Sequence, residues 1–168
     1  KVKSILRSEE LRWYLGIIAG ATLLIAWNTL SRWGGILQSL RYAFFQVASV
    51  ITTTGFATAD FNLWPELSRM LLLVLMLVGA CAGSTGGGMK VSRLIIMLKS
   101  AKREISRMLH PRSVYTLQFE GKPLEDQTIH NVFTYFFILV FLVIASVLLV
   151  SLDNMDFDST FSAVLACI

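Results

Sequence analysis

Charged side chains are scarce in this chain of 168 residues. Asp, Glu, Lys and Arg make up 15% of it, against roughly 25% in soluble domains. Apolar residues account for 55%, and the mean hydropathy is +0.64. This shortage of charge argues against an ordinary soluble domain and predicts a membrane protein.

Cysteines and catalytic sets are also few. Cys81 and Cys167 have no metal-ligand spacing and imply no disulfide framework, so both are expected to be small buried residues. No Ser-His-Asp, Cys-His or paired-carboxylate set occurs at membrane-compatible positions. We therefore predict no enzyme and no bound cofactor. The first apolar run is too long for a cleavable signal peptide and lacks a small-residue cleavage site.

Three long runs of the sequence carry no charge: residues 13–31, 70–89 and 127–152. The hydrocarbon core of a bilayer is about 30 Å thick and needs about 20 helical residues. The first and third runs suit that length. The second is rich in glycine, which disfavours one continuous helix.

Basic residues are distributed unevenly between these runs. Eight lie between residues 90 and 127, and four more lie at positions 1, 3, 7 and 12. Positively charged segments stay in the cytoplasm, so the N-terminus and the region 99–128 are predicted to be cytoplasmic. This asymmetry explains the net charge of +4. A nucleic-acid surface is the weaker interpretation because the basic residues lie close to the ends of the apolar runs.

The expected order of elements follows from these patterns and from turn residues. A helix over 7–30, an outer loop over 32–39 and a short apolar helix over 40–51 come first. A helix then opens at Pro65 and breaks over 79–90. The next helix runs from Lys90 past Lys102, with an apolar side (Leu94, Met97, Leu98, Ala101, Ile105 and Met108), and ends at His110-Pro111.

The rest of the chain is expected to hold a small hairpin and two more helices. Residues 114–120 alternate between apolar and polar, and Gly121-Lys122 is a candidate turn. A crossing helix covers 128–152, and a short apolar helix over 160–168 is capped by Asp158 or Ser159. Residues 159–168 follow the third run as 39–51 follow the first, which indicates a repeat by position.

The segment ITTTGFAT, residues 51–58, lies within 18 uncharged residues at 42–59. Irregular backbone survives at membrane depth only where protein buries it or where it lines a water-filled path. A loop after a short helix can offer carbonyl oxygens to a dehydrated cation, and glycine permits the positive φ that aims them. With no acidic residue in the segment, K⁺ or Na⁺ is favoured over a divalent ion. The alternative is a polar turn in an interfacial loop.

The segment GSTGGGMK, residues 83–90, is the second unusual stretch. Met89 and Val91 break the spacing of a phosphate-binding loop, so nucleotide binding is disfavoured. We interpret residues 79–90 as a break in the inner helix that obstructs or clears a path. The alternative to a break is a continuous helix whose glycines, spaced four residues apart, allow another helix to pack closely. Ser84, Thr85 and three successive glycines favour the break.

These two motifs together, with the HPR…Y link after the broken helix, resemble the TrkH/KtrB-type membrane subunits of the Trk/Ktr/HKT potassium-transport superfamily. The resemblance covers nearly the whole chain. It implies an all-α membrane protein of four helix–pore loop–helix repeats around one pore. The chain would be a piece of a longer polypeptide: a repeat over 8–108, a link over 109–127, and the start of the fourth repeat over 128–168.

The resemblance also implies roles for particular residues. The selectivity filter maps to Thr53, Thr54, Gly55 and Phe56, with K⁺ coordinated at the first three. The gating loop maps to Gly79, Gly83, Ser84, Thr85, Gly86, Gly87, Gly88 and Lys90. The family is usually a homodimer in the bacterial inner membrane, regulated by a cytoplasmic nucleotide-binding subunit of the TrkA/KtrA kind.

The sequence thus predicts the pore-forming part of a K⁺ uptake system. Whether it acts as a passive channel or an ion-coupled symporter stays open. One alternative is a membrane scaffold that transports nothing. A membrane enzyme with a re-entrant active site is a second alternative, but it would need ionisable residues near the membrane centre, and no charged side chain is present between Tyr42 and Thr58.

Overall fold

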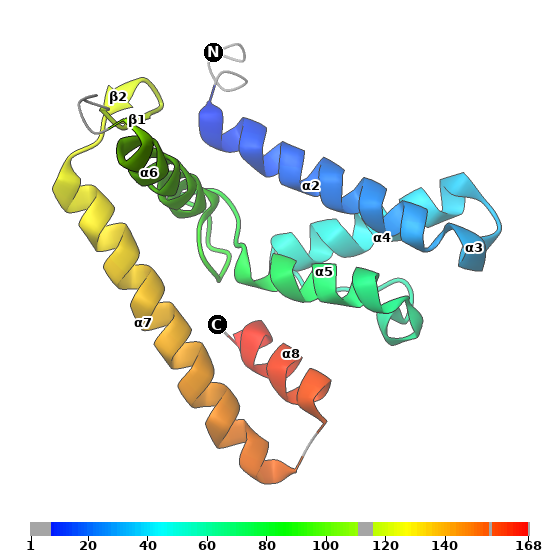
Figure 1. Cartoon of the computed structure of the whole chain (residues 1–168). Helices are drawn as coiled ribbons and strands as arrows, with labels where there is room; N and C mark the ends of the chain where they lie inside the picture. Colours follow the sequence, from blue (N-terminus) through cyan, green and yellow to red (C-terminus); the bar gives the residue numbers. More distant parts are fainter. Residues whose placement is uncertain (1–7, 111–115, 155, 168) are drawn as a thin grey trace.

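The computed structural model describes residues 8–110, 116–154 and 156–167 (Figure 1). Most of these residues are helical, as predicted, and a small two-stranded hairpin is also present. The helices are α2 (Glu9–Asn28), α3 (Leu30–Trp33), α4 (Ile36–Ile51), α5 (Glu66–Leu77), α6 (Val91–Leu109), α7 (Asp126–Val150) and α8 (Phe157–Cys167). The structure also contains two 3₁₀ turns, η1 (Phe61–Leu63) and η2 (Ser151–Asp153). Its two strands are β1 (Gln118–Phe119) and β2 (Lys122–Pro123).

One helical segment of the described chain is long and apolar enough to cross a membrane by length and composition. It is Asp126–Asp153, with 28 residues and a mean hydropathy of 2.9 over its most apolar window. Helix α2, with 20 residues, is as long as a span but less apolar. Helices α4 and α8 are apolar but shorter, which suits helices that enter a membrane without crossing it.

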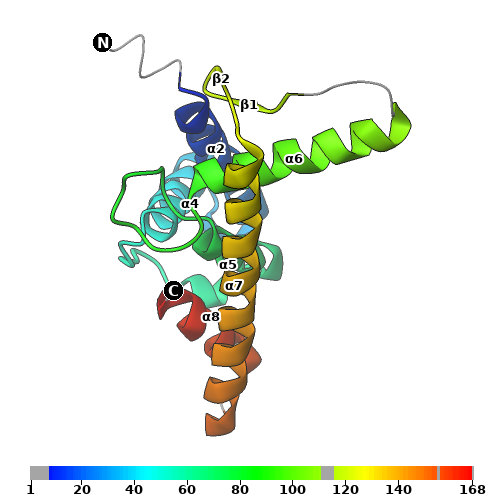
Figure 2. The same cartoon turned by 90° about the vertical axis from the view of Figure 1, so that its left-hand side faces the viewer.

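The main core lies where α4 packs between α2 and α5 (Figures 1 and 2). Ile25, Val47 and Ile51 are fully buried there, and Trp64 closes the core from the segment before α5. Burial of apolar side chains contributes about 1.5–3 kcal/mol each, so this core fixes the position at which α4 ends.

A second, smaller core joins α6, the hairpin and α7. It contains Ile96, Leu117, Ile129 and Val132. Helix α8 turns back along α7 and also contacts α5, and Figure 1 shows it beside the C-terminal half of α7. Helix α8 thus contacts α7, as α4 contacts α2.

Several helix boundaries differ from the prediction. The first helix ends at Asn28 because the Oγ1 atom of buried Thr29 donates to the Ile25 carbonyl at 2.8 Å, a local bond that competes with helix continuation. Helix α4 begins at Ile36 instead of 40, since left-handed Gly34 and extended Gly35 already complete the turn. Helix α8 begins at Phe157, so Asp158 lies inside its first turn.

One detail of the sequence interpretation was wrong. The hairpin turn is Glu120-Gly121, with Lys122 already in β2, and both turn residues adopt positive φ. Helix α6 is amphipathic, as predicted, and its apolar residues Leu98, Ile105 and Met108 are exposed. Its buried residues are Val91, Ile95, Ile96 and Ser100.

The cysteines also differ from expectation. Cys81 is half-buried and Cys167 is exposed, whereas both were expected to be buried. Cys81 lies in the broken part of the inner helix and Cys167 at the end of α8, so neither belongs to a helix face that packs into a core. Residues 114 and 115 of the alternating segment, and Pro111, lie outside the described residues.

Candidate ion-conduction site

Helix α4 ends in a double hydrogen-bonded cap formed by the threonines. The Thr53 N–H donates to the Val50 carbonyl at 3.0 Å, and the Thr54 N–H donates to the Ser49 carbonyl at 2.9 Å. Thr53 adopts a left-handed conformation, with φ of 54°. This is the Schellman arrangement, in which glycine is the usual left-handed residue.

Threonine in this position carries a strain. A β-branched residue with positive φ is uncommon and costs roughly 1–2 kcal/mol. Gly55, two residues later, has a φ of 79°, which glycine adopts without that cost. Two of the three residues from Thr53 to Gly55 thus adopt positive φ. Strained backbone of this kind concentrates at functional sites.

The cap turns the N–H groups of the loop toward α4. The Gly55 N–H also points to the Ser49 carbonyl, at 3.4 Å. Among the described residues, none donates a hydrogen bond to the carbonyl oxygens of Thr53, Thr54 or Gly55. Three successive carbonyls are therefore available to a cation, while the N–H groups that would repel it face the helix.

Side chains brace the same loop from both ends. The Ser49 hydroxyl donates to the Phe56 carbonyl at 2.6 Å, and the Thr52 and Thr54 hydroxyl oxygens lie 2.7 Å apart. Residues 52–58 are all exposed in the described chain. The filter loop, defined here as Thr53–Phe56, is thus held in shape by local polar contacts and not by burial.

The inner helix is broken where the sequence predicts it. Helix α5 ends at Leu77 and α6 begins at Val91. The Gly79 N–H donates to the Met89 carbonyl at 2.8 Å and the Met89 N–H to the Leu77 carbonyl at 3.0 Å. Together with the Val91 N–H, which donates to the Ala80 carbonyl at 3.4 Å, these bonds close the neck of an excursion over residues 79–90. We call it the gating loop after the role expected for it from the sequence.

Glycine at position 79 is required by close packing at this neck. A Cβ atom on Gly79 would lie 2.1 Å from the Gly87 carbonyl oxygen, which is impossible without a shift of the backbone. The two glycines therefore bring opposite sides of the loop into contact. Gly83 and Gly88 have φ of 84° and 71°, so they turn the chain at the tip and at the return.

The rest of the gating loop is organised by Lys90. Its Nζ donates to the Ser84 carbonyl at 2.9 Å and also to the Gly86 carbonyl. The Ser84 hydroxyl in turn donates to the Cys81 carbonyl at 2.6 Å. Thr85 is exposed within this turn. An ammonium group bonded to two backbone carbonyls makes the loop a single body.

The filter loop and the gating loop meet directly. A Cβ atom on Gly86 would lie 3.3 Å from the Thr53 hydroxyl oxygen. Both loops also line one cavity of about 360 Å³, together with Met76 and the end of α8. Its lining residues are Ser49, Val50, Thr53, Gly55, Met76, Gly87, Gly88, Leu165, Ala166 and Cys167. The structure therefore brings together residues separated by more than one hundred positions.

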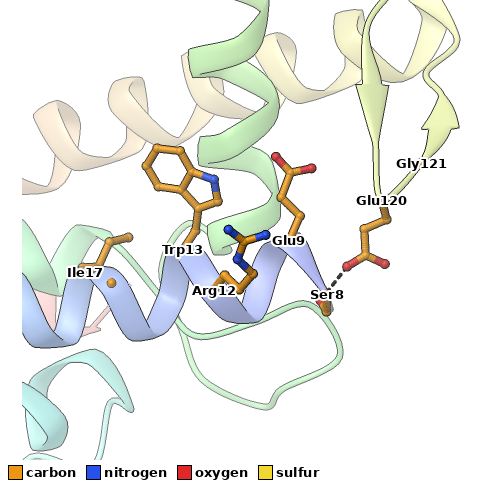
Figure 3. Close-up of a pocket in the computed structure, with 8 residues that line it drawn as sticks. Ser8, Glu9, Arg12, Trp13, Ile17, Glu120 and Gly121 are labelled. Atoms are coloured by element: carbon orange, nitrogen blue, oxygen red, sulfur yellow. Dashed lines mark hydrogen bonds between the residues drawn. The ribbon is translucent and has the colours of Figure 1, made fainter. Parts of the chain in front are cut away.

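A larger pocket, about 1050 Å³, lies elsewhere, between the start of α2 and the hairpin (Figure 3). Its lining includes Arg12, Trp13 and Glu120, and no residue from the filter loop or the gating loop. The Ser8 hydroxyl donates to the Glu120 carboxylate across it, the dashed line in Figure 3. This pocket is therefore separate from both loops.

Sequence reasoning missed several residues of the site. Ser49 braces the filter loop, Glu10 hydrogen-bonds to the gating loop, and Leu165–Cys167 line the shared cavity. Ser49 carried a weak signal, as a polar residue in the last turn of an apolar helix. Glu10 carried none, because its partner lies 72 residues away.

Comparison with known proteins gives a consistent result. The model of the TrkH family, described as cation transport protein, matches residues 36–168. Over 166 residues, or 95% of this chain, it is 38% identical to "Trk system potassium uptake protein TrkH" of Halomonas elongata. The protein of the same name from Escherichia coli K12 is 33% identical over 164 residues, again 95% of the chain.

A solved structure matches as well. The crystal structure of the potassium transporter TrkH from Vibrio parahaemolyticus covers 96% of this chain with a TM-score of 0.88 and 34% identity. That match spans 35% of the solved chain, and the two relatives are matched over 34% of their length. The chain thus spans about a third of the length of these relatives.

Short apolar helices beside a long one, with a broken inner helix between them, define a helical membrane transport protein. The fold class predicted from the sequence is confirmed. The chain belongs to the TrkH family of cation transport proteins. The family is one of transporters and not of enzymes, which confirms the prediction that the chain is no enzyme.

Proposed function

We propose that this chain forms part of the pore of a potassium uptake system and selects K⁺ with the carbonyl oxygens of Thr53, Thr54 and Gly55. The observation that carries the proposal is the cap of α4. It directs the N–H groups of the filter loop to helix carbonyls and leaves three successive carbonyl oxygens without a described donor. Rings of such carbonyls replace the hydration shell of an ion in potassium filters.

Electrostatics support the same assignment. The C-terminal end of a helix carries a partial negative charge that favours a cation, and α4 ends at Ile51, directly before the loop. No acidic side chain occurs between residues 42 and 59, which suits a monovalent ion better than a divalent one. The relatives named above are potassium uptake proteins, and potassium is the transported ion in this proposal.

The gating loop is proposed to block the path below the filter. Gly86 lies against Thr53, and Gly87 and Gly88 line the same cavity as the filter loop. A loop held at one neck by three hydrogen bonds can move as a body when that neck or its outside contacts change. Displacement of this loop would open the path.

The remaining assignments belong to the whole protein. The excess of basic residues from Lys90 to Lys122, most of them on α6, favours a cytoplasmic N-terminus in the bacterial inner membrane. We propose four repeats in one polypeptide, with residues 8–108 as the third and 128–168 as the start of the fourth. A homodimer and a cytoplasmic nucleotide-binding subunit are the proposed partners.

Replacing Gly55 in the intact protein tests the filter. Gly55→Ser places a side chain at a φ of 79°, which costs roughly 1–2 kcal/mol for a non-glycine residue. The loop should relax and displace its carbonyls, so discrimination of Rb⁺ over Na⁺ should fall by about tenfold, the effect of about 1.4 kcal/mol. Competitive uptake in cells that lack other potassium transporters measures this ratio.

Ala57→Ser is the matched control. It adds the same hydroxyl two residues later, at an exposed position without positive φ, and should leave the ratio unchanged. Equal Rb⁺ and Na⁺ uptake by Gly55→Ser and the parent, at equal amounts in the membrane, would contradict the filter assignment.

A further inference from the structure

The first turn of α2 contains two adjacent carboxylates, Glu9 and Glu10. Acidic residues are common in this position because they complement the positive end of the helix dipole, and Ser8 already supplies the N-cap. That effect accounts for their presence on the helix. It does not account for their partners, which lie on two other parts of the fold.

Glu10 holds the gating loop. Its Oε1 atom accepts a hydrogen bond from the Ala82 N–H at 2.6 Å. Among the described residues, Glu10 is the one side chain from outside the gating loop that hydrogen-bonds to its backbone. The neighbouring turn is closed by other atoms, since Ser84 bonds to the Cys81 carbonyl, so the Ala82 N–H is free for this contact.

Glu9 holds the helix that follows the loop. Its carboxylate pairs with Lys99 of α6 at 2.6 Å, and Lys99 Nζ also donates to the Gln118 carbonyl of β1 at 2.8 Å. Figure 3 shows Glu9 extending from α2 toward α6. The first turn of α2 therefore contacts both the gating loop, at Ala82, and the helix that follows it, at Lys99.

A series of contacts connects Ala82 to the filter loop. Lys90 ties the Ser84 and Gly86 carbonyls to the returning chain, so the tip of the loop moves as one body. Gly86, in that body, lies against the Thr53 hydroxyl. The chain of contacts from Glu10 to Thr53 is thus continuous through backbone and one ammonium group.

We propose that Glu10 is a positioning residue that holds the gating loop in its blocking position, through the hydrogen bond to the Ala82 N–H. This inference rests on the proposed function of the two loops. When α2 and α6 move relative to one another, the bond breaks and the loop leaves the filter. The Glu9–Lys99–Gln118 contacts connect that movement to the hairpin on the same side.

The test uses the whole protein reconstituted in liposomes without any regulatory subunit. Glu10→Ala removes the acceptor and should raise Rb⁺ flux by about threefold or more, in keeping with the loss of a partly exposed charge-assisted hydrogen bond. The Rb⁺ to Na⁺ ratio should stay that of the parent, because the filter loop is untouched. Glu10→Gln keeps an oxygen acceptor and should give a smaller rise.

A second measurement reports access to the loop. Cys81 lies beside Ala82 and is half-buried, so a variant in which it is the sole cysteine reports release of the loop. Because the Glu10 charge itself acts on the Cys81 thiol, the rate of modification by a water-soluble thiol reagent is compared at pH values where the thiol is fully ionised in both proteins. At that plateau the rate should rise by about twofold or more in Glu10→Gln, since a neutral acceptor holds the N–H less strongly. This variant carries the test if Glu10→Ala fails to reach the membrane.

Glu125→Ala is the control, an exposed carboxylate before α7 whose side chain makes no cap bond; it should match the parent in both assays. Unchanged flux and unchanged Cys81 modification in the Glu10 variants would overturn the role of Glu10. If Gly55→Ser alters selectivity while the Glu10 variants do nothing, this inference fails and the filter assignment stands. If Gly55→Ser leaves selectivity intact, the filter assignment fails on its own.

Discussion

Gly79 is the residue with the least room in the gating loop. The Gly87 carbonyl oxygen occupies the space that a side chain would need, 2.1 Å from an ideal Cβ. Overpacking of this kind costs typically about 1–3 kcal/mol. The backbone contact cannot yield as a flexible side chain would, so the neck of the loop has to open.

Gly79→Ala should therefore both destabilise the protein and release the gate. We expect a lower thermal midpoint, together with basal Rb⁺ flux raised by about threefold or more, since about 0.7 kcal/mol suffices for that factor. Thermal unfolding in detergent and flux in liposomes measure the two effects. The direction of the flux change is decisive, because simple loss of fold would lower it.

Gly35→Ala is the control for this change. The space around Gly35 is open within 4 Å, and its φ of −160° is extended backbone that alanine adopts. Flux and midpoint should match the parent. A Gly79→Ala protein with the parent's flux and a normal midpoint would show that the neck is looser than the contact with Gly87 implies.

At the scale of elements, an ion pair joins α5 to α8. Arg69 in the first turns of α5 pairs with Asp158 in the first turn of α8. The pair lies between the inner helix of one repeat and the short apolar helix of the next. Both side chains are partly exposed, at 31% and 47%, so solvent screening limits the pair to about 1 kcal/mol or less.

A charge swap tests this connection. Arg69→Glu and Asp158→Arg should each lower the thermal midpoint, and the double variant should recover part of the loss, with a coupling of about 0.5 kcal/mol. Recovery should be incomplete because an arginine in the first turn of α8 opposes the helix dipole. Midpoints of the four proteins, measured at low and high salt, give the coupling.

Arg41→Glu serves as the comparison for the swap. Arg41 is exposed on α4, with no ion pair in the described part of the chain. Its reversal should shift the midpoint little and should not couple to Asp158. Additive effects of Arg69→Glu and Asp158→Arg, with no recovery in the double variant, would show that the pair does not tie α8 in place.

How far the sequence predicts these elements depends on the kind of signal. The break over 79–90 was predictable because five glycines in ten residues oppose a helix. The start of α4 was missed by four residues because the left-handed turn at Gly34 is shorter than an average loop. The contact between Glu10 and Ala82 joins positions 72 residues apart, and no local pattern encodes such a pairing.

The conformation of the filter loop was also predictable only in part. The sequence indicated that the threonines end a helix, and it pointed to Gly55 as the residue with positive φ. In the structure Thr53 is left-handed as well and makes the cap itself. Glycine is the usual left-handed residue at such a cap. The left-handed conformation of a β-branched residue there can be recognised only once the backbone is known.

At the scale of the whole molecule, the described chain has large unpaired apolar surfaces. Phe137, Phe141, Leu148 and Leu149 on α7 are each more than 60% exposed. Residues of this kind need lipid or further helices around them. In the proposed pore the filter loop likewise supplies one wall of the path, and α8 supplies the start of another.

The fragment alone should therefore not conduct. Liposomes containing only residues 1–168 should take up Rb⁺ no faster than empty liposomes, while the whole protein at equal density gives clear uptake. The physical reason is that one row of carbonyls cannot replace the hydration shell of an ion. Saturable Rb⁺ uptake by the fragment would mean that copies of it assemble into a pore by themselves.

Thr53 has one more consequence, for protein engineering. Replacing a left-handed threonine by glycine relieves local strain, so a search for thermostable variants would favour Thr53→Gly at this cap. The same change deletes the hydroxyl that lies against Gly86. A variant selected for heat resistance is thus expected to leak, and activity assays should accompany every stabilising screen of this protein.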